Sequence, residues 1–345
     1  VSLHQTTFLF LSLYFFFFCF LFLSFSSFFF FFLFFYFLPL LISYPPLPFF
    51  FIFLLSVSFL LPFSFFLLYF FFTEVGWVLQ CDRCNYLRSV LKVQIGGAAH
   101  RNLNERSRLS ALEVLRKESF QIILSRLRQL DCRSGRLLDV GCGHGWFLDM
   151  ASQAGFEVVG IEPDKQIGDY AAARGHEIRN GFFPDCVDRE ERFDVVVFND
   201  VLEHLPAPDS IVDACRRLLA DSSYLVINGP SARGVLYRTA RWFARLGWMG
   251  LYERMWQKGF PSPHISYFTP EQLAHLAGRM QLHERGRQRL NTLHLRGLWD
   301  RLRYDRQRPL VVSGLLYLGL LSCMMFLRFL PADIEFQIFQ KVERR

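Results

Sequence analysis

Short apolar runs alternate with helical patterns through the middle of the chain. Apolar residues recur at helical spacing from Ser110 to Leu130, which predicts an amphipathic helix. Four β-rich runs follow, RLLDVG, FEVVGIE, FDVVVFN and SYLVING, and helical segments such as PDSIVDACRRLLA lie between them. Strands that alternate with helices are typical of a parallel sheet with helices on both faces. The pattern therefore predicts an α/β fold.

The alternation breaks in an insert, residues 230–265, that is rich in aromatic residues and Arg. After it, Thr269 is a suitable N-cap and Pro270 a suitable first helical residue, so a helix is predicted to begin there. Near the C-terminus, polar residues alternate with three apolar ones, Ile334, Phe336 and Ile338. Such alternation predicts an antiparallel strand at or next to the edge of the sheet.

Residues 1–73 differ from the rest of the chain, because they contain no Lys, Arg, Asp or Glu and hold most of the 42 Phe. Uncharged apolar runs of this length are typical of transmembrane helices, and the prolines would divide the tract into two or three. However, Phe, Leu, Ser and Pro all have all-pyrimidine codons, whereas the remainder uses Arg far more than Lys. We expect translated non-coding sequence or a wrong gene start, with membrane insertion as the alternative, and therefore predict the fold from Glu74 onward.

The charge and the cysteines limit the class of protein. The 345 residues carry a formal net charge of +7, with a pI near 9.1, but the Arg residues are scattered. Nucleic-acid binding is not indicated, because there is no long basic block or aromatic-interleaved stripe. The cysteines are mostly dispersed along apolar segments, which favours a reduced, cytosolic compartment over a disulfide framework.

The stretch RLLDVGCGHGWFLDM suggests a ligand site. An apolar run ends in Asp139, and Gly141, Gly143 and Gly145 alternate with other residues before a helical pattern resumes. Bare backbone at the start of a helix allows a nucleotide to approach unpaired N–H groups. A dinucleotide fingerprint would need glycine where Trp146 stands, so the spacing is that of the other common form, GxGxG after an acidic residue.

LLDVGCGHG resembles motif I of the class I S-adenosylmethionine (SAM)-dependent methyltransferases, and the resemblance covers about residues 110–280. It implies a doubly wound seven-stranded sheet with an antiparallel last strand, and SAM as cofactor. In this family the glycine loop packs under the methionine part of SAM, and an acid ending the second strand accepts both ribose hydroxyls. The residues that match the cofactor-binding positions are Asp139, Gly141, Gly143, Gly145, Glu162, Phe182 (beside adenine) and Asn199.

The acceptor side is predicted from NDVLEHL, which resembles the acid-x-x-Glu-His element of ubiquinone-biosynthesis O-methyltransferases. The resemblance implies a divalent metal, Mg²⁺ or Zn²⁺, bound by Asp200, Glu203 and His204, and a general-base role for His204. The alternative is that Glu203 and His204 only tether the loop by hydrogen bonds. His264 matches a family element at the mouth of the acceptor pocket, where it either contacts substrate or pins a loop, and His144 is expected to fill space facing SAM.

Two further segments are interpreted through the same resemblance. Many relatives carry a zinc knuckle with two CxxC pairs, and residues 74–107 resemble a remnant with one pair, Cys81 and Cys84, so no bound zinc is expected. The methyltransferase domain is predicted to span 108–345. Within it, the apolar segment 309–330 is flanked by Arg, which predicts a helix lying on an anionic membrane surface, with a buried helix and a true span as alternatives.

The resulting hypothesis is a SAM-dependent methyltransferase that transfers a methyl group to oxygen of a small-molecule or lipid-linked acceptor. We expect it in the cytoplasm, peripheral at the inner face of the membrane. One alternative is C- or N-methylation of a sugar or other metabolite, and another is a membrane-associated SAM-fold binding module without activity. The fold alone does not determine the acceptor.

Overall fold

The computed structural model describes residues 76–93, 105–290, 299, 310–311, 313–314, 317–319, 321 and 331–342, and only the backbone of 105–115. The tract 1–73 lies outside the described residues. Most of the predicted apolar helix 309–330 does too, and the few residues of it that are described are helical. Within the described ranges, no helix has both the length and the apolar character needed to cross a membrane.

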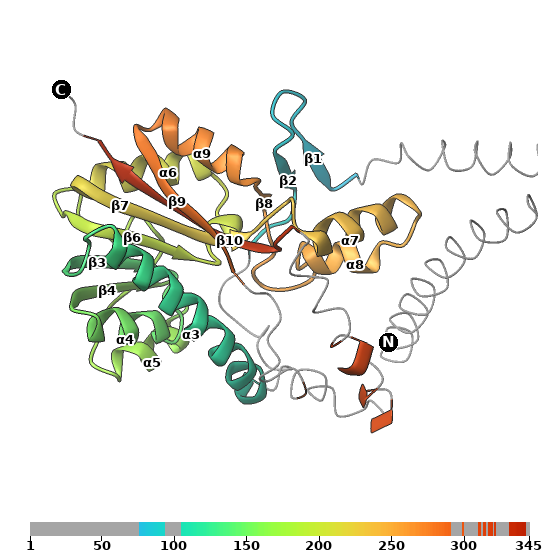
Figure 1. The fold of residues 1–345 in the computed structure, drawn as a ribbon, viewed down its shortest axis with the longest axis horizontal. Coiled ribbons are helices and arrows are strands. Elements are labelled where there is room, and N and C mark those ends of the chain that lie inside the picture. Colours follow the sequence, from blue (N-terminus) through green and yellow to red (C-terminus); the bar gives the residue numbers. More distant parts are fainter. Residues whose placement is uncertain are drawn as a thin grey trace, which may run out of the picture. The chain divides into compact units, whose positions relative to one another are not determined.

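Seven strands form the main sheet in the order β5-β4-β3-β6-β7-β10-β9 (Figure 1). The first five in this order are parallel, and β10 runs antiparallel to both of its neighbours, β7 and β9, which confirms the predicted doubly wound fold. Each predicted run lies in a strand: β3 (Gly135–Val140), β4 (Phe156–Glu162), β6 (Phe193–Asn199), β7 (Leu219–Pro230) and β10 (Ile334–Lys341). The short strand β5 (Glu177–Asn180) completes the parallel part of the sheet.

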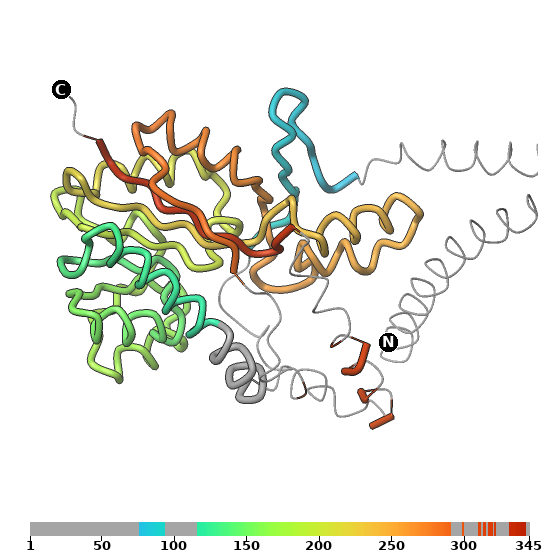
Figure 2. The backbone as a smooth tube through the Cα atoms, viewed as in Figure 1, coloured from blue at the N-terminus to red at the C-terminus, as the bar shows by residue number. Residues whose placement is uncertain are grey.

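The edge strand β9 (Leu282–Leu290) was not predicted. Its sequence, LHERGRQRL, has only two buried apolar residues, which are its two ends. Figure 2 shows β9 running beside β10, and backbone pairing along this whole length holds it in the sheet. The predicted alternation of β10 was incomplete, because Gln337 and Phe339 are as deeply buried as Phe336 and Ile338 on the opposite face.

Helices cover both faces of this sheet and bury its apolar residues. Helices α3 (Glu105–Gln129) and α4 (Trp146–Gln153) pack on one face, and α6 (Pro208–Leu218) and α9 (Pro270–Arg279) pack on the other. Thr269 caps α9 as predicted: its hydroxyl accepts from the Gln272 N–H (3.3 Å), and the Gln272 side chain accepts from the Thr269 N–H (2.7 Å).

A smaller sheet consists of β1 (Val78–Gln80), β2 (Leu87–Ser89) and β8 (Ser266–Tyr267). The turn between β1 and β2 carries Cys81 and Cys84, both exposed. The insert forms α7 (Val235–Arg245) and α8 (Gly250–Met255), which pack with this sheet in an aromatic cluster, namely Tyr237, Tyr252, Trp256 and Tyr267. This packing fixes the chain from 263 to 267 against the carboxyl end of the main sheet.

Candidate active site

The glycine loop joins β3 to α4 in the way the sequence predicts. The N–H groups of Gly141 and Cys142 both donate to the carbonyl oxygen of Ile161, at 2.8 and 2.9 Å, which ties the loop to β4. Gly145 has a φ of +79°, and a Cβ there would lie 2.8 Å from the Cβ of Ala171. Only glycine fits this position without strain.

Glu162 ends β4 directly beside this loop. Its carboxylate accepts hydrogen bonds from the N–H groups of Gly143 and Asp164, both at 3.0 Å, and the residue is only 8% exposed. Burial raises the pKa of Glu162, and the two N–H bonds act in the opposite direction. Two carboxylate oxygens retain further acceptor capacity, which fits a pair of ribose hydroxyls.

Asp139 lies at the end of β3 and is almost completely buried. The amide of Asn199 donates to its carboxylate at 3.3 Å, so these two predicted cofactor residues are in contact across adjacent strands. Burial raises the pKa of Asp139 to about 8. Phe182 is more peripheral: it follows β5, and it is 55% exposed.

The acceptor-side residues lie after β6, in a turn of 3₁₀ helix, Leu202–His204. Asp200 has a φ of +56°, and its carboxylate lies 3.6 Å from the guanidinium of Arg116 on α3. The Nδ1–H of His204 donates to the carbonyl of Pro263 (2.9 Å), which leaves its Nε2 with a lone pair. Burial lowers the pKa of His204 and raises that of Glu203.

His264 is hydrogen-bonded through both ring nitrogens. Its Nδ1–H donates to the hydroxyl of Tyr267 (3.2 Å), and that hydroxyl donates to the carbonyl of Met255 (2.8 Å). Its Nε2 therefore accepts from the amide of Gln257 (2.9 Å). Burial lowers the pKa of His264 to about 3, so the ring is neutral. These bonds favour the loop-pinning alternative for His264.

The predicted metal ligands are only partly assembled. The groups that lie together, with ligand atoms within 4.8 Å of one another, are Glu203, His204 and His264. Asp200 is not part of this group and faces Arg116 instead. Because both nitrogens of His264 are engaged, the group offers two free donor residues, and protein metal sites typically use three or four. The side chains as arranged therefore do not fit a metal ion.

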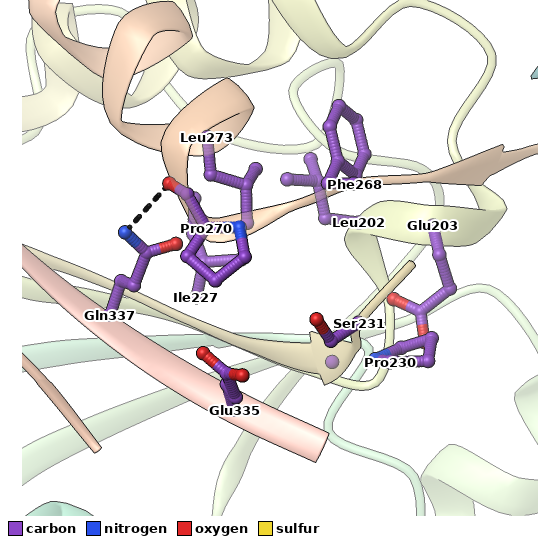
Figure 3. A pocket seen from close by; sticks show the side chains of 11 residues that line it. Leu202, Glu203, Ile227, Pro230, Ser231, Phe268, Pro270, Leu273, Glu335 and Gln337 are labelled. Carbon is purple, nitrogen blue, oxygen red and sulfur yellow. Dashed lines mark hydrogen bonds between the residues drawn. The ribbon is translucent and has the colours of Figure 1, made fainter. Parts of the chain in front are cut away.

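A small cavity of about 20 Å³ lies behind Glu203, between β7, β10 and α9 (Figure 3). It has room for about one water molecule, and it is far below the several hundred Å³ of typical ligand pockets. The Gln337 amide closes one side by donating to the Pro270 carbonyl (3.0 Å). This cavity is therefore not the acceptor pocket.

Three residues of the site were missed by the sequence analysis: Arg116, Gln257 and Tyr267. Arg116 reaches Asp200 from α3, and His264 is held by Gln257, in the turn after α8, and by Tyr267 on β8. Tyr267 could have been found, since it stands three residues after His264 in the segment PHISYF. Arg116 and Gln257 carry no local signal, because only folding brings them to this edge.

The bare loop and the acid that ends the adjacent strand are typical of nucleotide-binding doubly wound domains, and the polar cluster follows the neighbouring strand β6. Residues 113–283 match the family model for a methyltransferase domain. The chain belongs to the class I SAM-dependent methyltransferases, whose cofactor is SAM.

Among curated proteins, the chain is 31% identical over 110 residues to the ubiquinone biosynthesis O-methyltransferase of Bradyrhizobium diazoefficiens, which covers 30% of this chain and 43% of that protein. It is 33% identical over 107 residues to the Pseudomonas aeruginosa protein of the same name, covering 27% and 45%. The chain thus spans less than half the length of these relatives.

The solved structures that resemble the chain are more distant. Magnesium protoporphyrin IX methyltransferase from Synechocystis, with bound SAH, has a TM-score of 0.42 and 12% identity, and the match covers 71% of this chain and 90% of that one. A SAM-dependent methyltransferase from Thermotoga maritima has a TM-score of 0.46 and 16% identity, covering 70% and 96%.

Proposed function

We propose that the protein transfers the methyl group of SAM to an oxygen atom of a small-molecule or lipid-linked acceptor. The observation that carries the proposal is the buried carboxylate of Glu162, which meets the N–H of Gly143 where a ribose would lie beside the loop. There is room for a ligand beside Gly143, because a Cβ added there would meet no atom within 4 Å.

In this proposal the chain mainly aligns the reacting groups. SAM supplies a methyl group on a good leaving group, and alignment of two reactants can lower a barrier by ~7–11 kcal/mol. The glycine loop, Asp139 and Asn199 would hold the methionine part, Glu162 the ribose, and Phe182 would line the adenine. The proposed acceptor lies at the carboxyl ends of β6 and β7, where open α/β sheets bind ligands.

His204 is the proposed general base for a hydroxyl acceptor. Its Nδ1–H is fixed on the Pro263 carbonyl, and burial lowers its pKa, so Nε2 is unprotonated near pH 7 and able to accept a proton. The bonds of His264 support a role in positioning the adjacent backbone, and the substrate contact remains the alternative. Oxygen is favoured over carbon or nitrogen by the partial relatives, which are named O-methyltransferases.

His204→Asn is expected to lower turnover about 100-fold while the Kd for SAM stays within about two-fold, because general bases typically contribute 10²–10⁴ in rate. The assay is formation of S-adenosylhomocysteine from SAM with an o-diphenol, a primary amine and a nucleotide sugar as candidate acceptors. His275→Asn, on the exposed part of α9, is the matched control and should leave the rate unchanged. Unchanged turnover in His204→Asn would contradict the role. If no acceptor gives product although SAM binds, the binding-module alternative is favoured.

We also propose peripheral contact with an anionic membrane surface, which would suit a lipid-linked acceptor in the cytoplasm. Support comes from the Arg-flanked segment 309–330 and from α7, on which Leu236, Arg238 and Trp242 are all exposed. Apolar side chains next to cations are typical of surface-bound helices. We expect the protein to sediment with phosphatidylglycerol vesicles at low salt, and less with phosphatidylcholine or at high salt. Equal sedimentation with both lipids would contradict this.

A further inference from the structure

A cluster of polar side chains, those of Asp149, Arg174 and His176, is attached to the glycine loop. Asp149, in the first turn of α4, forms an ion pair with Arg174 and a 2.7 Å hydrogen bond with Nε2 of His176. Arg174 also donates to the carbonyl oxygen of His144 within the loop, at 3.3 Å. The loop and the start of α4 are therefore fastened to the segment that follows helix α5 (Lys165–Ala172).

The same helix also contacts the ribose-binding acid at its other end. Its N-cap, Asp164, donates its N–H to the Glu162 carboxylate at 3.0 Å and accepts from the N–H of Gln166 at 2.9 Å. Near its C-terminus, Ala171 packs so closely on Gly145 that no Cβ would fit between them. One short helix thus links Glu162 to the glycine loop.

An aromatic contact reinforces the polar one. The ring of His144 stacks on Trp146, with centroids 5.5 Å apart, and lies 5.3 Å from Tyr170 on α5. The ring of His144 thus packs between the first residue of α4 and helix α5, and its expected position facing SAM stays a prediction.

Partial burial of Asp149 and His176 makes their contact stronger than an ordinary surface pair. The side chains of Asp149 and His176 are 20% and 10% exposed, and that of Arg174 is 41% exposed. By contrast, the Lys165–Asp169 pair on the same helix is 73% and 57% exposed, and exposed pairs contribute little. Asp149 also lies in the first turn of its helix, where a negative charge is favourable.

We propose that Asp149, with Arg174 and His176, is a positioning residue that sets the distance between the glycine loop and Glu162 and so determines affinity for the methionine end of SAM. The inference rests on the proposed function, because it takes SAM as the ligand. It assigns these side chains no contact with the cofactor, only with the backbone that holds it.

The test compares two ligands by calorimetric titration. Asp149→Asn should weaken SAM binding about ten-fold, whereas binding of 5′-methylthioadenosine, which lacks the amino-acid part, should stay within about two-fold; ten-fold corresponds to about 1.4 kcal/mol. Arg174→Gln should act in the same way. The double variant should bind SAM as tightly as Asp149→Asn alone, because both substitutions remove the same ion pair.

Asp169→Asn is the matched control, since it removes an ion pair from α5 without touching the loop; both ligands should bind it as they bind wild type. Two results would overturn the inference: unchanged SAM affinity in Asp149→Asn and Arg174→Gln, or equal weakening of both ligands, which indicates general loss of stability. If wild-type protein binds 5′-methylthioadenosine and SAM, the proposed cofactor stands even when this inference fails. If it binds neither, both fail.

Discussion

Replacing Glu162 with Ala is expected to weaken SAM binding at least about 100-fold. The carboxylate would lose two hydrogen bonds to ribose hydroxyls, and a hydrogen bond to a charged group contributes about 1.5–3 kcal/mol. The loss also removes the acceptor for the Gly143 and Asp164 N–H groups, so the loop is less well held. Calorimetric titration with SAM measures the effect directly.

The control for this variant is Glu157→Ala on the same strand. The side chain of Glu157 is 70% exposed and forms an ion pair with Arg136 at 3.3 Å, away from the glycine loop, so SAM affinity should be unchanged. Glu162→Gln should fall between wild type and Glu162→Ala, because an amide oxygen still accepts a hydrogen bond. A Kd for Glu162→Ala within about three-fold of wild type would show that the ribose is bound elsewhere.

SAM binding is expected to release a proton below about pH 8. Burial, reinforced by the negative charge of Glu162, raises the pKa of Asp139 to about 8, against a hydrogen bond from Asn199 and the attraction of Arg116. Asp139 is therefore largely protonated at neutral pH. A positively charged ligand beside it favours the carboxylate and lowers its pKa, so binding must expel the proton.

The direction in which SAM affinity changes with pH follows from the coupling of SAM binding to proton release. Between the lowered pKa of the complex and about pH 8, each unit of acidification should weaken SAM affinity up to ten-fold, and above about pH 8 this dependence should vanish. Titrations in two buffers of different ionisation enthalpy count the released protons. In Asp139→Asn, which has no proton to lose at this position, the dependence should become flatter. An affinity for SAM that is independent of pH from about 6 to about 8 would contradict the prediction.

The sequence was sufficient where a signal is local. Alternating strands and helices, the glycine loop and the Thr269 cap depend on neighbouring residues, and the structure confirms each of them. The strand β9 was missed because an edge strand with few apolar residues has no distinct pattern; its pairing with β10 holds it in place. Arg116 was missed because its partner, Asp200, is distant along the chain, and Gln257 because only the turn after α8 brings its amide to His264.

The sequence by itself determined that a bare turn is followed by an acid at the end of the next strand, because both positions lie within short, regular segments. Only the tertiary structure decided the chemical state of these groups. Burial, which depends on strands and helices remote in sequence, gives Asp139 its raised pKa and His264 its lowered one. The contacts of Asp149 with Arg174 and His176 likewise exist only because α5 folds back across the loop.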